Sequence, residues 1–170
     1  MDHTFKTGLT PLMCSEPRIL ILGSLPSDMS IASQEYYGNP RNLFWRVIAG
    51  ISDEPVPECY AEKKDLLARH HIALWDVYAA AERQGSLDTN IKDGAFNDIE
   101  GIVKKYPTIT TIVFNGGKAF KMFGKYLKTN ASNINTLKSL KYYPCASTSS
   151  MVQSAGWTLD KLIEQWKEIL

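Results

Sequence analysis

Four short apolar runs, each leading into a turn or a polar loop, limit most strictly what this chain can fold into. The runs cover residues 18–22, 71–75, 110–114 and 140–145, and amphipathic segments separate them. Short apolar runs that stop at turn residues are typical of buried β-strands. Strands that alternate with helices form a parallel sheet covered on both faces. We therefore predict an α/β fold, a three-layer α/β/α sandwich around a central parallel sheet of about four strands.

The segments between the runs show helical periodicity. Asn39 and Pro40 are a typical helix start, and Asp93 is expected to cap another helix. Helices are expected at residues 40–50, 60–70, 94–106, about 119–127 and at the C-terminal end. Between them we expect a short helical turn and polar loop over 79–90, a loop over 129–139 and an N-terminal arm over 1–17. The length of 170 residues and the absence of a linker predict a single domain, 1–170.

Charge and cysteine content exclude several classes of protein. A formal net charge of +1 provides no global field toward nucleic acid, although a local basic rim can still bind phosphates. The three cysteines form no C-x-x-C pair, which argues against a disulfide framework and against a standard metal site. Because the chain starts without a signal pattern and has no apolar run of membrane length, we expect a soluble cytoplasmic protein.

Two enzyme classes are disfavoured by missing motif residues. Gly116, Gly117 and Lys118 follow a predicted strand, but Ile112 stands where a phosphate loop needs its first glycine. Ser24 lies at a strand end as a hydrolase nucleophile would, but the G-x-S-x-G elbow and a downstream histidine are absent. Asp28, Glu35 and Asp76 could provide the acid pair of a sugar hydrolase, although such carboxylates are more often caps or solvated groups.

The remaining polar side chains at the predicted strand ends are asparagines, aromatics and hydroxyls. The set is Tyr36, Tyr37, Asn39, Asn42, Asn115, Ser147, Thr148 and Ser149. Amide groups can read a base edge or orient a water molecule, and aromatic rings can stack on a planar ligand. Hydroxyl-rich loops contact phosphate oxygens. Together these residue types predict a pocket for a nucleobase whose backbone is held outside it.

Six segments then occur in one order along residues 18–150. They are Gly23–Ser27, Tyr36–Trp45 (Y-Y-x-x-P-x-N-x-F-W), Leu74–Val77, Arg83–Asp88 (R-x-G-S-L-D), Phe114–Ala119 and Ser147–Ser149. In this set the chain resembles the uracil-DNA glycosylase superfamily, closest to its hypoxanthine (deoxyinosine) and mismatch-specific uracil/thymine branches. The resemblance implies one glycosylase-like domain that hydrolyses the N-glycosidic bond of a flipped base in double-stranded DNA, with hypoxanthine, uracil or mismatched thymine as the base. It further implies a monomer with no metal and no cofactor.

The resemblance also distributes roles over the site. Leu25 stands where mismatch-specific uracil glycosylases carry a water-orienting Asn, and the hypoxanthine branch is also apolar there, so the water-orienting role moves to Asn42. The implied catalytic residues are Asn42 and Ser24, and the implied base pocket is Leu25, Tyr36, Tyr37, Asn115 and Gly116. The implied DNA contacts are Ser147, Thr148, Ser149, Lys118 and Met151, the last as a wedge in the vacated stack.

Three departures from the family pattern keep other functions open. Ser27 replaces the glycine of the first turn, and Ala146 and Ser150 replace the prolines that flank the last motif, while Leu25 leaves the first motif without a polar catalyst. A nucleic-acid-binding module of the same fold without turnover is one alternative. A small-molecule hydrolase of the same fold is another, and lesion-duplex cleavage separates the three.

Overall fold

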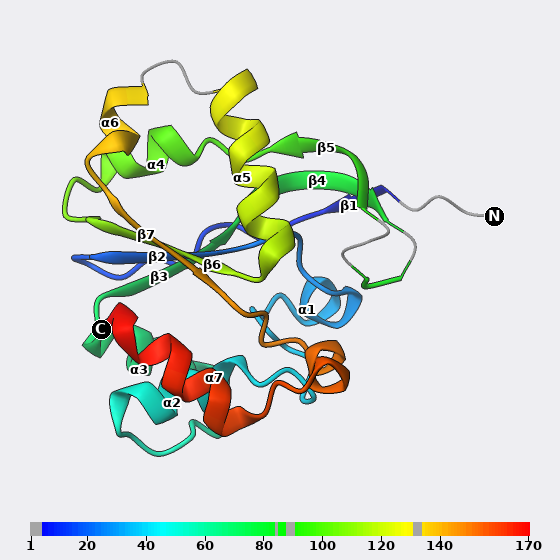
Figure 1. Cartoon of the computed structure of the whole chain (residues 1–170), viewed down its shortest axis with the longest axis vertical. Helices are drawn as coiled ribbons and strands as arrows, with labels where there is room; N and C mark the ends of the chain where they lie inside the picture. The colour runs from blue at the N-terminus through cyan, green and yellow to red at the C-terminus, as the bar shows by residue number, and fades with distance from the viewer. Residues whose placement is uncertain (1–4, 84, 88–90, 131–133) are drawn as a thin grey trace.

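The central feature of the computed structural model, which describes residues 5–83, 85–87, 91–130 and 134–170, is a four-stranded parallel sheet (Figure 1). Its strand order is β3-β2-β6-β7. The strands are β2 (Ile19–Gly23), β3 (Ile72–Asp76), β6 (Thr111–Asn115) and β7 (Lys141–Cys145). Each pair of neighbours is parallel, so all four strands point the same way. The predicted parallel sheet is confirmed, with strand boundaries shifted by at most one residue.

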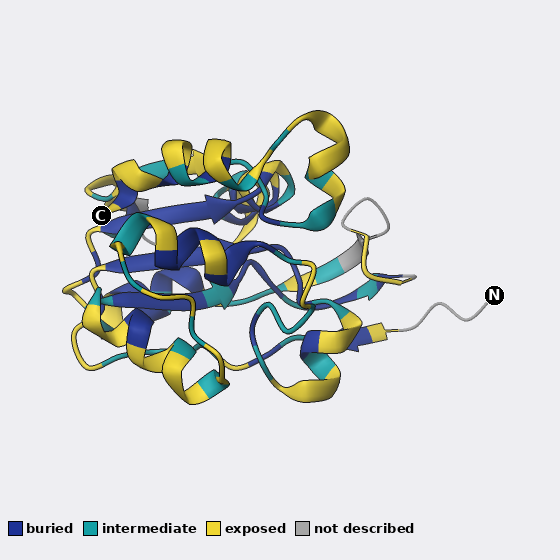
Figure 2. Ribbon diagram, turned by 90° about the horizontal axis from the view of Figure 1, so that it is seen from below, coloured by how far each residue is buried: buried dark blue, intermediate teal, exposed yellow. Residues whose placement is uncertain are grey.

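Helices cover both faces of this sheet and complete the predicted three layers (Figure 1). One face is packed by α2 (Phe44–Ser52), α3 (Tyr60–Arg69) and α7 (Leu159–Trp166); the other by α4 (Ile99–Lys105), α5 (Gly117–Thr129) and α6 (Ile134–Lys138). Alternate residues of β2 enter the two cores, Ile21 on the α2 side and Leu22 on the α5 side. Every residue of β2 is buried, as the dark centre of Figure 2 illustrates.

A second, antiparallel sheet corrects two predictions. It has the order β1-β4-β5, from β1 (Phe5–Thr7), β4 (Tyr78–Arg83) and β5 (Ile91–Phe96). The alanine-rich segment expected to form a helical turn is β4, because pairing with a strand on each side outweighs the helical preference of alanine. Asp93 lies in β5, and Asp98 caps α4 instead by accepting a hydrogen bond from Gly101 N at 2.9 Å. Residues 84 and 88–90 of the predicted loop lie outside the described residues.

The segment before α2 also differs from its prediction. Asn39 does not cap this helix: its Oδ1 accepts from Arg41 N at 3.0 Å, and its carbonyl accepts from Asn42 N at 2.9 Å. These bonds close a turn, so α2 begins only at Phe44. A short helix that was not predicted, α1 (Asp28–Ser33), follows the first turn and is capped by the Ser27 side chain.

Three further segments complete the chain. The 3₁₀ helices η2 (Ser150–Ala155) and η3 (Lys167–Ile169) flank α7, and α6 lies within the segment predicted as a loop over 129–139. The predicted N-terminal arm contains β1 and a bridge between Leu12 and Leu74. No helix in the described part of the chain is long and apolar enough to cross a bilayer.

Candidate active site

The carboxyl ends of the four parallel strands meet at one edge of the sheet. Gly23 at the end of β2 is in register with Asp76 of β3, and Asn115 of β6 is in register with Cys145 of β7. The ends of these strands and the segments that follow them carry the residues predicted to act in catalysis or binding. In open α/β sheets this edge is where ligands bind.

Three side chains from three of these elements form one hydrogen-bonded network. Asn115 Nδ2 donates to Thr148 Oγ1 at 2.9 Å, and Thr148 Oγ1 donates to Asn42 Oδ1 at 2.7 Å. Two backbone N–H groups add to the network: Thr148 N donates to Asn115 Oδ1, and Leu43 N, next to Asn42, donates to the Thr148 carbonyl, each at 2.9 Å. Thr148 is completely buried. The network therefore fixes the loop after β7 to the end of β6 and to the start of α2.

Asn42 is oriented by this network. Its Oδ1 accepts from Thr148 Oγ1 and, at 2.9 Å, from Phe44 N. An amide atom that faces two donors must be the oxygen, so the NH₂ group points elsewhere. In the described part of the chain no acceptor is paired with Asn42 Nδ2, and the residue is half-buried. Asn42 therefore has two N–H donors to offer a ligand.

The two tyrosines before α2 lie in different surroundings. Tyr36 is buried, its hydroxyl donates to the Thr10 carbonyl at 2.8 Å, and burial together with the nearby Asp76 raises its pKa. Tyr37 is half-buried with a left-handed φ of 52° and stacks on Phe44 at a ring separation of 3.9 Å. Both roles in a base pocket stay predictions, and Tyr37 is the more accessible ring.

The first turn, residues 23–26, lies close to Tyr37 and Asp76. A Cβ on Gly23 would lie 2.5 Å from Asp76 Oδ1 and 3.4 Å from the Tyr37 hydroxyl. Only glycine leaves room for the Asp76 carboxylate, since a real Cβ does not come within 2.5 Å of another heavy atom. Ser24 is buried at the edge, whereas the Leu25 side chain packs into the core on the α5 side. Leu25 therefore presents its backbone, and not its side chain, to the edge.

Gly116 connects β6 to α5 by a conformation that side chains rarely adopt. Its φ is 102°, and a Cβ there would lie 3.0 Å from Cβ of Ser147. The turn lets Gly116 N donate to the Cys145 carbonyl at 3.0 Å. Lys118 follows in the first turn of α5 and is half-buried. The position of Gly116 thus brings the loop after β7 against the start of α5.

The loop after β7 combines internal and external groups. Ser147 Oγ accepts from Ser149 N at 3.1 Å, and Ser149 Oγ accepts from Met151 N. Both serines are half-buried, and Met151 is 60% exposed at the start of η2. Contacts of these residues and of Thr148 with DNA stay predictions, and in this structure the Thr148 hydroxyl is used within the protein.

Imidazole groups are far from this edge in the part of the chain that is described. His70 ends α3 and its Nε2 lies 2.6 Å from Glu54 Oε1, while His71 precedes β3 at the end opposite to Asp76. Among the described residues no group of three or more His, Cys, Asp or Glu side chains is placed to hold a metal ion. The chemistry of the edge therefore rests on amides, hydroxyls, aromatic rings and a buried carboxylate.

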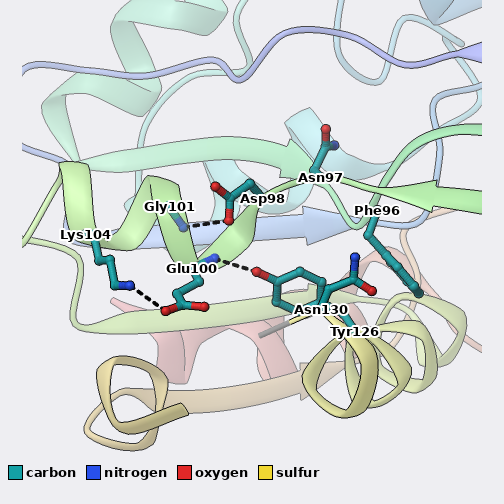
Figure 3. A pocket seen from close by; sticks show the side chains of 8 residues that line it. All are labelled: Phe96, Asn97, Asp98, Glu100, Gly101, Lys104, Tyr126 and Asn130. Atoms are coloured by element: carbon teal, nitrogen blue, oxygen red, sulfur yellow. Dashed lines mark hydrogen bonds and ion pairs between the residues drawn. The ribbon is translucent and has the colours of Figure 1, made fainter. Parts of the chain in front are cut away.

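A cavity of about 470 Å³ opens between α4 and α5 and shares no residue with the predicted site (Figure 3). Its polar groups satisfy one another: Asp98 caps α4, Lys104 pairs with Glu100, and Glu100 N donates to the Tyr126 hydroxyl at 2.8 Å. Figure 3 shows that the bond from Glu100 N to Tyr126 connects α4 to α5, while the other two bonds lie within α4 and its cap. The cluster therefore anchors the start of α4.

Two features of the edge escaped sequence reasoning. The sequence placed Thr148 with the DNA contacts, but its hydroxyl joins residues 33 and 106 positions away. Arg83, quoted only as part of a motif, donates hydrogen bonds to the first turn. Neither the Thr148 bonds nor the Arg83 bonds can be recognised from the periodicity or composition of the sequence, because both depend on how distant segments pack.

Comparison with known proteins places this geometry in a family. The pattern described as the Uracil DNA glycosylase superfamily matches residues 10–169. A protein of Methanosarcina acetivorans named hypoxanthine DNA glycosylase is 44% identical over 115 residues, which are 67% of this chain and 73% of that protein. One of Methanosarcina barkeri with the same name is 36% identical over 151 residues, which are 80% of this chain and 93% of that protein.

A solved structure is similar over nearly the whole chain. The solution NMR structure of a Methanosarcina acetivorans protein assigned as a uracil DNA glycosylase has a TM-score of 0.79 and 33% sequence identity. It covers 98% of this chain, which in turn covers 96% of that structure.

Proposed function

This chain belongs to the uracil DNA glycosylase superfamily, and on that premise we propose that it is a DNA glycosylase that removes hypoxanthine from double-stranded DNA. Both curated relatives carry the name hypoxanthine DNA glycosylase, and hypoxanthine arises from adenine by deamination. We also propose that the protein is a monomer and that it acts in the cytoplasm. Uracil and mismatched thymine are the other bases that the experiment tests.

The observation that carries the proposal is the network in which buried Thr148 holds Asn42 and Asn115. Hydrolysis of an N-glycosidic bond breaks the bond from C1′ to the base nitrogen and forms a bond from C1′ to a water oxygen. The departing base takes up a proton and the water loses one. Because the sugar becomes oxocarbenium-like before the water bonds, the enzyme has more need of position and electrostatics than of a strong nucleophile.

Asn42 suits the task of positioning that water. Its oxygen is fixed by two donors, so its N–H groups have a defined direction. Tyr37, stacked on Phe44, provides a ring face beside it for a flipped base. Asn115 uses its Oδ1 and one Nδ2 hydrogen in hydrogen bonds with Thr148. The other Nδ2 hydrogen can donate to the edge of a base.

The experiment uses duplexes with one hypoxanthine, one uracil or one G·T mismatch, incubated with the full chain and then treated with hot alkali. Strand breaks at hypoxanthine that appear only after alkali are expected, since water attack leaves an abasic site. Asn42→Ala should lower the single-turnover rate by about 10²-fold, the effect of removing a positioned polar group. Asn39→Ala is the matched control, because that asparagine only closes a turn with Arg41 and Asn42.

Each outcome has one meaning. An absence of breaks with all three lesions would overturn the proposal, and binding without breaks would assign the chain to the non-catalytic alternative. Release of base from a free nucleoside without DNA would assign it to the small-molecule hydrolases. Equal rates for Asn42→Ala and the unaltered chain would remove Asn42 from the mechanism.

A further inference from the structure

Arg83 is a charged side chain buried behind the first turn. It ends β4 and is 1% exposed. Its Nη1 donates to the Leu25 carbonyl at 3.1 Å, Nη2 donates to the Pro26 carbonyl, and Nε donates to the Gly85 carbonyl at 2.9 Å. Burying a guanidinium is costly unless its donors are satisfied, so this arrangement demands a specific partner surface. The first two of these carbonyls belong to the turn that borders Tyr37 and Asp76 in the proposed site.

All four carbonyl groups of the turn point toward the second sheet. Val77 N donates to the Gly23 carbonyl at 2.8 Å and Tyr78 N donates to the Ser24 carbonyl at 3.1 Å. Arg83 takes the next two carbonyls. In a trans peptide the N–H points away from the C=O of the same unit, so the turn's N–H groups face away from β4. In the described part of the chain no acceptor is paired with Leu25 N–H.

We propose that Arg83 is a positioning residue, which holds the Leu25 and Pro26 carbonyls toward β4 and so aims the backbone N–H groups of the first turn into the active site. The inference rests on the proposed function and explains how a turn with an apolar side chain at Leu25 contributes to it. A fixed N–H donor stabilises negative charge that develops on a leaving base or holds a water molecule.

The guanidinium is suited to this task in a way that lysine is not. Its planar fork donates to two neighbouring carbonyls at once, whereas an ammonium group is a compact point charge. Lys6 lies on β1, next to the hairpin of β4 and β5, and its Nζ donates to Asp28 Oδ1 and to the Gly85 carbonyl. Lys6 is also buried, but among the described residues its hydrogen bonds go to Asp28 and Gly85 and not to the Leu25 or Pro26 carbonyl. It is therefore a matched control for a buried cation that anchors the hairpin only.

The first test compares Arg83→Lys and Arg83→Gln with Lys6→Gln at a temperature at which thermal unfolding shows every variant to be folded. We expect both Arg83 variants to lower the single-turnover rate on the hypoxanthine duplex by about tenfold or more, as misplacement of site groups does. Affinity for a duplex with a tetrahydrofuran abasic analogue should stay within about threefold, because phosphate contacts dominate binding. Lys6→Gln should keep the cleavage rate within about threefold of the unaltered chain, even if its melting temperature falls as much as that of the Arg83 variants.

The second test does not depend on activity. In ¹H–¹⁵N spectra, Arg83→Lys should displace the amide signals of Ser24, Leu25 and Ser27 and speed their exchange with solvent, while the signals of Asn42 and Thr148 stay in place. Unmoved turn signals, or a rate equal to that of the unaltered chain, would overturn the inference. If the unaltered chain cleaves no lesion, the proposed function fails, and the spectra alone then decide whether Arg83 sets the turn.

Discussion

The Thr148 hydroxyl donates a 2.7 Å hydrogen bond to Asn42 Oδ1, across 106 positions of the chain. The same hydroxyl accepts from Asn115 Nδ2, so one buried oxygen joins the start of α2, the end of β6 and the loop after β7. The first turn has an apolar side chain at Leu25 that packs into the core. At position 25 the first turn therefore contributes backbone to the proposed site, and the amide side chains come from Asn42 and Asn115.

Replacing Thr148 by valine should weaken both fold and activity. Valine has the same shape but leaves Asn115 Nδ2 without its acceptor, which costs about 1–3 kcal/mol of unfolding free energy. Asn42 loses one of the two donors that orient it, and we expect the single-turnover rate on hypoxanthine to fall about tenfold or more. Denaturant unfolding and alkali-revealed cleavage measure the two effects.

Thr148→Ser is the control for this prediction, because it keeps the hydroxyl and loses only a methyl group. Its rate should remain within about threefold of the unaltered chain, as expected when the hydrogen bonds persist. A valine variant that matches the serine variant in rate would show that the network is not needed for activity.

Adding a methyl group at Gly23 should disturb the edge of the sheet. The new Cβ would lie 2.5 Å from Asp76 Oδ1, so the buried carboxylate must shift. Gly23→Ala should cost about 1–3 kcal/mol of unfolding free energy, as overpacking does, and should lower cleavage. The comparison is Gly124→Ala in α5, where a Cβ meets nothing within 4 Å and where alanine should add about 0.5–1 kcal/mol. Equal stability of the two variants would contradict the crowding at Gly23.

Truncating Met151 should affect DNA and not the fold. Its side chain is 60% exposed, so Met151→Ala should leave the melting temperature unchanged. If the side chain fills the space of a flipped base, the dissociation constant for a lesion duplex should rise about tenfold, consistent with the few kcal/mol of an unstacked step. Val56, 52% exposed in the loop between α2 and α3, provides a control by Val56→Ala. Fluorescence anisotropy measures both, and an unchanged Met151→Ala constant would reject the wedge.

The Glu54 carboxylate should make stability depend on pH in the acid range. Hydrogen bonds from Arg69 and then His70 lower its pKa from the ordinary 4.5 to about 2. The folded state binds a proton on Glu54 less readily than the unfolded state does. The contribution of the ionised Glu54 to folding stability is therefore complete above pH 4.5 and is lost as the pH falls toward 2. Glu54→Gln should therefore lower the melting temperature at pH 7, with a difference that narrows in acid. A difference that does not vary with pH would contradict this linkage.

Local chemistry was enough to locate the central sheet and the neighbourhood of the site. The strand at residues 18–22 is apolar, short and followed by Gly23, and a fully buried parallel strand needs that pattern. Because parallel strands end at one edge, the motif residues that follow them were expected to meet, and Asn42, Thr148 and Asn115 do. Local preference failed at residues 79–81, where three alanines that favour a helix are held in β4 by β1 and β5.

The sequence by itself determined the residue types at the edge, because the strand ends and the motif order can be read along the chain. Only the tertiary structure decided what those residues do for one another. Thr148 became the hydroxyl between two asparagines, and Arg83 became the donor to the Leu25 and Pro26 carbonyls. The physical reason is that a hydrogen bond requires its two atoms within about 3 Å, and no local propensity fixes the distance between groups 58 or 106 positions apart.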